Sequence, residues 1–183
     1  AQPMASPDGR LHLVCNGEIY NYVELRQQRE ARGDRFATHS DTEVLLHELA
    51  ADSRGALPRL DGMFALACWD AERQELLLAR DRFGVKPLYY AIRNGDLVFA
   101  SEPRALLLHP LVSREIDPQA VQQFFTHHHI PSPRSIYRDI RKLEPGHFLV
   151  FGPRGLHQHV AYVTSPLRDP AAPTPPLADA ARN

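Results

Sequence analysis

The stretch that decides the fold is CNGEIYN at residues 15–21, followed about twenty residues later by SDTEV at residues 40–44. Just before it, LHLVC at residues 11–15 begins with alternating apolar and polar residues, which is typical of a strand. From Tyr22 the apolar period changes to that of an amphipathic helix. We therefore predict a corner at Asn16-Gly17, where a strand ends and the chain turns into a helix.

The simplest interpretation of Asn-Gly is a turn, because both residues tolerate positive φ. The neighbouring residues indicate chemistry as well. A reaction that passes through a tetrahedral oxyanion needs fixed hydrogen-bond donors, and the Asn16 amide with the Gly17 N–H supplies two. The carboxylates of Glu18 and Asp41 can hold an ammonium group. Together these residues predict a pocket for an amino acid whose side-chain carbonyl is attacked.

Asp41 also has a structural interpretation. Ser40 with Glu43 three residues later is a capping-box pattern ahead of an apolar run, so a helix is expected to begin here. Acidic residues are favoured in the first turn of a helix. The spacing alone favours this helix-start role for Asp41 over a ligand role, and the two roles are compatible.

Six motifs follow one another across residues 16–149, and they are NGEIYN, SDTEV, DGMFALACWD, LLARDRFGVKPLYY, FASEPRALL and KLEPGHFL. This series resembles the glutaminase domain of glutamine-hydrolysing asparagine synthetases, a class II glutamine amidotransferase with the N-terminal-nucleophile hydrolase fold. The resemblance implies that Asn16 and Gly17 form the oxyanion hole and that Glu18 and Asp41 bind glutamine. It further implies hydrolysis of glutamine to glutamate and ammonia, for ATP-dependent amidation of aspartate or a related carboxylate in a separate domain.

The fold class follows from the apolar runs. The run from Gly62 to Trp69 is nearly continuous, as expected of a strand buried on both faces. Two further strands flank Arg93-Asn94-Gly95-Asp96, a hairpin turn, so the sheets are expected to be largely antiparallel in an α+β protein. The four-layer αββα sandwich, incomplete at the N-terminus, is implied by the resemblance. We assign residues 1–165 to a type-2 amidotransferase domain and the Pro/Ala-rich residues 166–183 to a linker toward an absent synthetase domain.

The resemblance places the nucleophile, a cysteine that begins the mature chain, several dozen residues upstream of residue 1. In this mechanism the α-amine of that cysteine is the general base. Cys15 does not fit the role, because its amine is locked in a peptide bond, and we interpret it as a packed core thiol. Residues 1–183 alone are therefore expected to lack glutaminase activity.

Composition restricts the partners. The net charge of −1 gives no electrostatic basis for binding nucleic acid or an anionic membrane. No apolar run reaches the length of a membrane span, and two cysteines inside apolar runs fit a reduced, cytoplasmic protein. The partners that the resemblance implies are glutamine and a C-terminal synthetase domain, with a homodimer left open. No cofactor is expected in this domain, whereas ATP and Mg²⁺ are expected in the synthetase domain.

Two other features invite functional interpretations. His127, His128 and His129 are adjacent, but consecutive helical residues point about 100° apart and cannot converge on one ion, so no metal site is predicted and their role is unassigned. The loop from Arg80 to Pro87 is basic with an aromatic residue, and its internal acid favours a salt-bridged structural loop over a nucleic-acid contact.

Two alternatives stay open at this stage. One is a noncatalytic amidotransferase-like module kept for binding or packing, because folds are retained when chemistry is lost. The other is a different class II amidotransferase, of the phosphoribosyl-pyrophosphate or glucosamine-phosphate type. Those enzymes share Asn-Gly but generally not the following Glu-Ile-Tyr-Asn.

Overall fold

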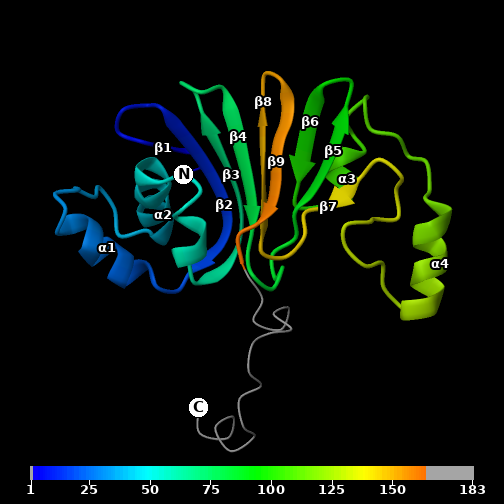
Figure 1. The fold of residues 1–183 in the computed structure, drawn as a ribbon, viewed down its shortest axis with the longest axis horizontal. Helices are drawn as coiled ribbons and strands as arrows, with labels where there is room; N and C mark the ends of the chain where they lie inside the picture. Colours follow the sequence, from blue (N-terminus) through cyan, green and yellow to red (C-terminus); the bar gives the residue numbers. More distant parts are fainter. Residues whose placement is uncertain (1, 164–183) are drawn as a thin grey trace, which may run out of the picture.

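The structure is a computed structural model that describes residues 2–163, so the linker predicted for residues 166–183 lies outside the described residues. Two stacked sheets with helices on both sides make up this part of the chain (Figure 1). In chain order the elements are β1 (Met4–Ala5), β2 (Leu11–Ile19), α1 (Tyr22–Glu30), α2 (Asp41–Ala51), the 3₁₀ turn η1 (Leu57–Arg59), β3 (Gly62–Asp70), β4 (Glu75–Arg80), β5 (Tyr89–Arg93), β6 (Asp96–Ala100), α3 (Pro103–Leu106), α4 (Pro118–His127), β7 (Arg141–Lys142), β8 (His147–Gly152) and β9 (Gly155–Ala161).

Every strand pairing among the described residues is antiparallel. One sheet has the strand order β1-β2-β3-β4-β8-β9, and the other has the order β6-β5-β7. In Figure 1, α1 and α2 lie beside the larger sheet on the left, and α3 and α4 lie beyond the smaller sheet on the right. No helix in residues 2–163 is long and apolar enough to cross a membrane.

Three apolar clusters define four layers. The cluster between α1, α2 and the larger sheet includes Leu25, Leu45, Leu49, Leu13 and Leu66. The cluster between the two sheets includes Ala65, Leu78, Leu149, Leu88 and Tyr90. The cluster under α3 includes Ala91, Leu106 and Ile140. The order is helix, sheet, sheet, helix, which confirms the predicted αββα sandwich.

Strand β3 is buried on both faces, as its apolar run predicted. Phe64, Leu66 and Cys68 face the helices, whereas Ala65 and Ala67 face the second sheet. The hairpin between β5 and β6 is also confirmed. Its two turn residues, Asn94 at φ 53° and Gly95 at φ 87°, both have the positive φ that a two-residue hairpin turn requires.

The corner predicted at Asn16-Gly17 is wrong. Strand β2 continues through both residues to Ile19, and they pair with Ala65 and Phe64 of β3. Gly17 is required for close approach: its φ is 154°, and a Cβ added there would lie 2.1 Å from the carbonyl oxygen of Met63. The glycine therefore lets two strands come together and does not turn the chain.

The start of α2 confirms half of the predicted capping box. Ser40 is the N-cap, and its Oγ accepts a hydrogen bond from the Thr42 N–H at 3.2 Å. Glu43 does not reach back to Ser40. Its carboxylate instead accepts the N–H groups of Ala37 and Thr38, both at 2.7 Å, and so fixes the connection that leads into the helix.

The close approach at Gly17 predicts a large effect of a single methyl group. We expect Gly17→Ala to lower the free energy of unfolding by about 3 kcal/mol or more, because the new Cβ overlaps the β3 backbone and φ is unfavourable. Gly9→Ala is the matched control, since Gly9 has a φ of 71° but open space around its Cβ position. It should cost only about 1 kcal/mol. Denaturant unfolding of both variants measures the difference, and equal losses would contradict the close-approach explanation.

Candidate active site

The candidate site lies on the edge of β2 that faces away from β3. Backbone groups of alternate residues in a strand point to the same edge. At Cys15 this edge is occupied by the Gln2 side chain. The Gln2 Oε1 accepts a hydrogen bond from the Cys15 N–H at 2.8 Å, and the Gln2 Nε2 donates to the Cys15 carbonyl at 2.9 Å. At Ile19 it is occupied by Asp41, whose Oδ2 accepts the N–H at 3.0 Å.

Gly17 lies between these two occupied positions and points to the same edge. The short strand β1 pairs only with His12 and Leu13, so it does not reach Gly17. On the other side of β3, the Phe64 N–H donates to the Asp81 carboxylate at 3.3 Å. The Phe64 carbonyl accepts the Asp81 N–H at 2.8 Å. Gly17 and Phe64 are thus a non-hydrogen-bonded pair. Within residues 2–163 the Gly17 N–H is left as a donor without a backbone partner.

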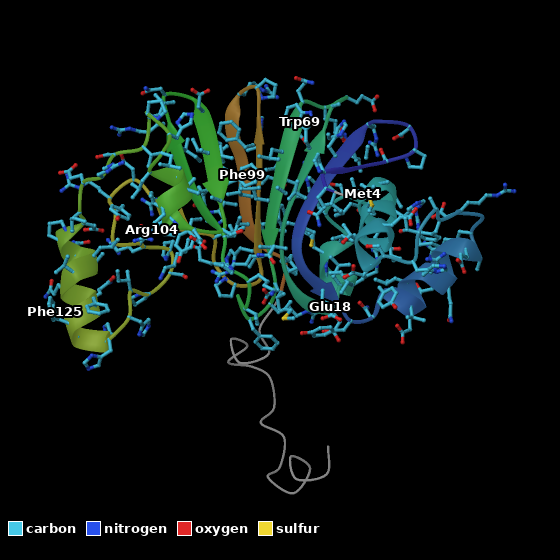
Figure 2. The ribbon with its side chains drawn as sticks, turned by 180° about the vertical axis from the view of Figure 1, so that it is seen from behind. Met4, Glu18, Trp69, Phe99, Arg104 and Phe125 are labelled. Carbon is cyan, nitrogen blue, oxygen red and sulfur yellow. The ribbon has the colours of Figure 1, made fainter. Side chains whose placement is uncertain are left out.

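The side chains of Asn16 and Glu18 lie on the same face of β2, the face directed toward the smaller sheet. They lie opposite Ala65 and Met63, and residues that pair across antiparallel strands point to the same face. Ala65 belongs to the cluster between the two sheets, so the Asn16 amide lies on the inter-sheet side, where it is exposed. Neither side chain has a hydrogen-bond partner among the described residues. Figure 2 shows Glu18 near the end of β2, where the chain leaves the sheet.

Asp41 is brought to this site by the start of α2. Its Oδ1 accepts the Thr42 N–H at 2.7 Å, which stabilises the first turn of the helix, while Oδ2 bonds to Ile19. The structural role of Asp41 at the helix start is therefore present. The same two bonds hold its carboxylate at the edge that carries Gly17, so all four predicted residues, Asn16, Gly17, Glu18 and Asp41, gather at one end of β2.

Cys15 is not suited to be a nucleophile. Its side chain packs against the cluster between the helices and the larger sheet. Burial, with a smaller effect from the negative charge of Asp41, raises the pKa of the Cys15 thiol to about 12. The thiolate is the reactive form, so this thiol is inert near neutral pH.

The three adjacent histidines lie at the far side of the molecule, where α4 ends. His128 takes the left-handed conformation at φ 58° that ends the helix. The rings of His127 and His129 are 6.1 Å apart at their centres. In the part of the chain that the structure describes, no group of three or more His, Cys, Asp or Glu side chains is arranged to hold a metal ion.

The sequence did not reveal the roles of Gln2 and Asp81, and it gave the wrong chemistry for the loop from Arg80 to Pro87. No ion pair joins Arg80 to Asp81. The Arg80 guanidinium donates to three carbonyls of this region at 2.7 Å, and the Asp81 carboxylate accepts N–H groups of the same loop. Asp81 followed by Gly84 is a local sign of an aspartate that bonds to its own turn.

Comparison with known proteins shows the family of this chain. A family described as "Glutamine amidotransferase domain" matches residues 1–162. Asparagine synthetase [glutamine-hydrolyzing] 1 of Bacillus subtilis is 41% identical over 154 residues, which are 84% of this chain and 24% of that protein. A putative asparagine synthetase [glutamine-hydrolyzing] of Mycobacterium bovis is 45% identical over 150 residues, 80% of this chain and 23% of that protein. The chain thus spans about a quarter of the length of these relatives.

A solved structure shares the fold. The glutamine phosphoribosylpyrophosphate amidotransferase from Bacillus subtilis, complexed with ADP and GMP, superimposes with a TM-score of 0.64 and 26% sequence identity. The match covers 90% of this chain and 32% of that one. The sandwich described above is therefore that of the N-terminal-nucleophile hydrolase amidotransferases.

The environment of the thiols gives a direct test. The pKa of Cys68 is also raised to about 12 by burial. Because the thiolate fraction sets the rate, we expect iodoacetamide to modify Cys15 and Cys68 of the folded chain at least about 100-fold more slowly at about pH 8 than in the guanidinium-unfolded chain. The rate should rise with pH beyond 9, the ordinary thiol value. Rapid modification of Cys15 in the folded chain would contradict this environment.

Proposed function

We propose, since this chain belongs to the class II glutamine amidotransferase family, that it is the glutamine-hydrolysing domain of an asparagine synthetase-like enzyme. The domain hydrolyses glutamine to glutamate and ammonia. A second domain of the parent protein uses that ammonia to amidate aspartate or a related carboxylate with ATP and Mg²⁺. The single observation that carries the proposal is the Gly17 N–H, which has no partner among residues 2–163. It lies next to the Asn16 amide and on the edge of β2 where Asp41 bonds to Ile19.

The proposed roles follow from charge. When the side-chain carbonyl of glutamine is attacked, its oxygen becomes negative, and two neutral donors fixed in advance stabilise that charge. Asn16 supplies a side-chain donor and Gly17 a backbone donor. The α-ammonium group of glutamine is assigned to Glu18 and Asp41. Support for Asp41 comes from its two backbone hydrogen bonds, which fix its carboxylate before any ligand binds.

The nucleophile of the proposed reaction is an N-terminal cysteine supplied by an upstream segment of the parent protein. Its thiol attacks the glutamine amide carbon while its own α-amine takes the thiol proton, which gives a tetrahedral adduct. The α-ammonium group returns that proton to the amide nitrogen, the carbon–nitrogen bond breaks and ammonia leaves. The thioester that remains is then hydrolysed by water to glutamate and the free thiol. Cys15 takes no part. Residues 1–183 by themselves are proposed not to hydrolyse glutamine.

The remaining partners are proposed from the length of the relatives. The matched region is about a quarter of each synthetase, so the rest of the parent is proposed to carry the ATP-dependent domain, reached through residues 166–183. We propose no cofactor for this domain and no binding site for nucleic acid or a membrane. A cytoplasmic location and a homodimer are part of the same proposal.

The oxyanion role is tested by Asn16→Ala in the parent enzyme. We expect kcat for glutamine hydrolysis to fall about 100- to 1000-fold, because one donor to the oxyanion is lost. His12→Ala is the matched control: it removes an exposed side chain from the same face of β2, four residues away, and should leave kcat unchanged. Ammonia release measured by a coupled assay distinguishes the two.

The ligand role of Asp41 has a separate prediction. Asp41→Ala removes a carboxylate from the proposed ammonium site and the acceptor of the Ile19 N–H, so we expect kcat/KM to fall strongly. Thr42→Ala keeps that carboxylate and both of its backbone hydrogen bonds and removes only the hydroxyl that donates to Oδ1 at 3.3 Å, so it should change kcat/KM little. If hydrolysis were unaffected in both Asn16→Ala and Asp41→Ala, the roles proposed for these two residues would be wrong. A parent protein that releases no ammonia from glutamine would instead favour the noncatalytic module.

A further inference from the structure

Asp81 is a fully buried carboxylate with an unusual set of partners. None of its side chain is exposed, and no lysine, arginine or histidine among residues 2–163 forms an ion pair with it. Four backbone N–H groups bond to it instead. Oδ1 accepts those of Phe83 and Val85 at 3.0 Å, and Oδ2 accepts those of Lys86 at 3.0 Å and Phe64 at 3.3 Å. Such bonds satisfy the hydrogen-bonding capacity of a carboxylate that has no contact with water.

The bond from the Phe64 N–H to the Asp81 side chain continues the hydrogen bonding of the sheet beyond the last β3–β4 pair. The β3–β4 pairing ends at Ala65 and Arg80. One residue further, the Asp81 N–H still donates to the Phe64 carbonyl at 2.8 Å, as in a continuing ladder, but the Asp81 carbonyl is used by Gly84 and Gly146 at 3.1 and 2.8 Å. The Phe64 N–H therefore has no carbonyl to bond to. The Asp81 side chain takes the place of the missing strand partner.

This bond affects the candidate site because Phe64 lies directly opposite Gly17. A Cβ at Gly17 would lie 2.6 Å from the Phe64 Cα, so the position of Gly17 is set by the β3 backbone beneath it. Asp81 holds both backbone groups of Phe64 on the side away from β2. The register of β2 against β3 directs the Gly17 N–H to the open edge, where it has no partner among residues 2–163.

We propose that Asp81 is a positioning residue for the oxyanion donors of Asn16 and Gly17. The proposal rests on the proposed glutaminase function and adds a residue that does not touch the substrate. Without the carboxylate, the Phe64 N–H loses its only partner at the end of β3, and the backbone supporting Gly17 shifts. A shift of about 1 Å in a catalytic group lowers the rate about 100-fold.

Arg80 strengthens the argument that the loop is a fixed support. Its guanidinium donates to the carbonyls of Gly84, Lys86 and Leu143, each at 2.7 Å, while Asp81 binds N–H groups of the same turn. Burial lowers the pKa of Arg80, and the neighbouring charge of Asp81 opposes that shift. Loss of the Asp81 carboxylate therefore removes one of the two sets of contacts that fix the loop.

The test is Asp81→Asn in the parent glutaminase. Asparagine keeps the size of the side chain but replaces one accepting oxygen with an NH₂ group, which cannot accept from two of the four N–H groups. We expect kcat for glutamine hydrolysis to fall about 30-fold or more, with KM within about threefold of the wild type. A fall in kcat without a change in KM is the sign of a misplaced oxyanion donor rather than of lost substrate binding.

Asp70→Asn is the matched control. Asp70 lies at the opposite end of β3, is 9% exposed, and accepts the N–H groups of Glu72 and Arg73 at 3.0 Å. Its replacement should destabilise the domain comparably in denaturant unfolding but leave kcat within about threefold of the wild type. Normal kcat in Asp81→Asn, or equal losses of kcat in both variants, would overturn the positioning role.

If Asp81→Asn does not fold, Gly84→Ala decides the question. Gly84 has a φ of 65°, and a Cβ there would lie 2.8 Å from Pro145 and 3.0 Å from the Arg80 guanidinium carbon, so the variant displaces the supporting turn while keeping Asp81. A lower kcat at unchanged KM supports the proposal, and an unchanged kcat overturns it. If Asn16→Ala lowers activity while the Asp81 and Gly84 variants are normal, only the positioning role fails. A parent enzyme that does not hydrolyse glutamine overturns both proposals.

Discussion

The contact between Gly17 and Phe64 is the constraint on which the rest of the site depends. The two residues face each other as a non-hydrogen-bonded pair, the closer of the two kinds of antiparallel pair, and no side chain fits between them. This geometry turns the Gly17 N–H outward and places the Asn16 amide on the adjacent face. A donor pair at the edge of a sheet is therefore built from two consecutive residues of one strand, without a loop.

Polar side chains complete the backbone hydrogen bonding around this pair. Gln2 bonds to Cys15, Asp41 bonds to Ile19, and Asp81 bonds to Phe64, each at a place where a neighbouring strand has ended. A buried backbone group without a partner costs about 1–3 kcal/mol, and this cost applies to the buried bond between Asp81 and Phe64. Gly17 is the position between them that receives no such partner. The contrast identifies its N–H as the group that is available to a ligand.

Local patterns predicted most of the elements. The hairpin turn at Asn94-Gly95, the N-cap at Ser40 and the doubly buried strand β3 depend on neighbouring residues or on a simple apolar run, and the structure confirms all three. The same kind of signal failed at Asn16-Gly17. A glycine required for a turn and a glycine required for close approach of another strand look identical in sequence, because the second strand lies 47 residues away along the chain.

The sequence by itself determined the family and the α+β composition and supplied four candidate site residues, because six ordered motifs and the apolar periodicity are properties of the linear chain. Only the tertiary structure decided that Asn16 and Gly17 lie within a strand, that Asp41 reaches that strand through Ile19, and that Asp81 supports it through Phe64. These relations depend on hydrogen bonds between segments distant in sequence. Such bonds form where a neighbouring strand has ended, and the sequence does not mark where each neighbouring strand ends.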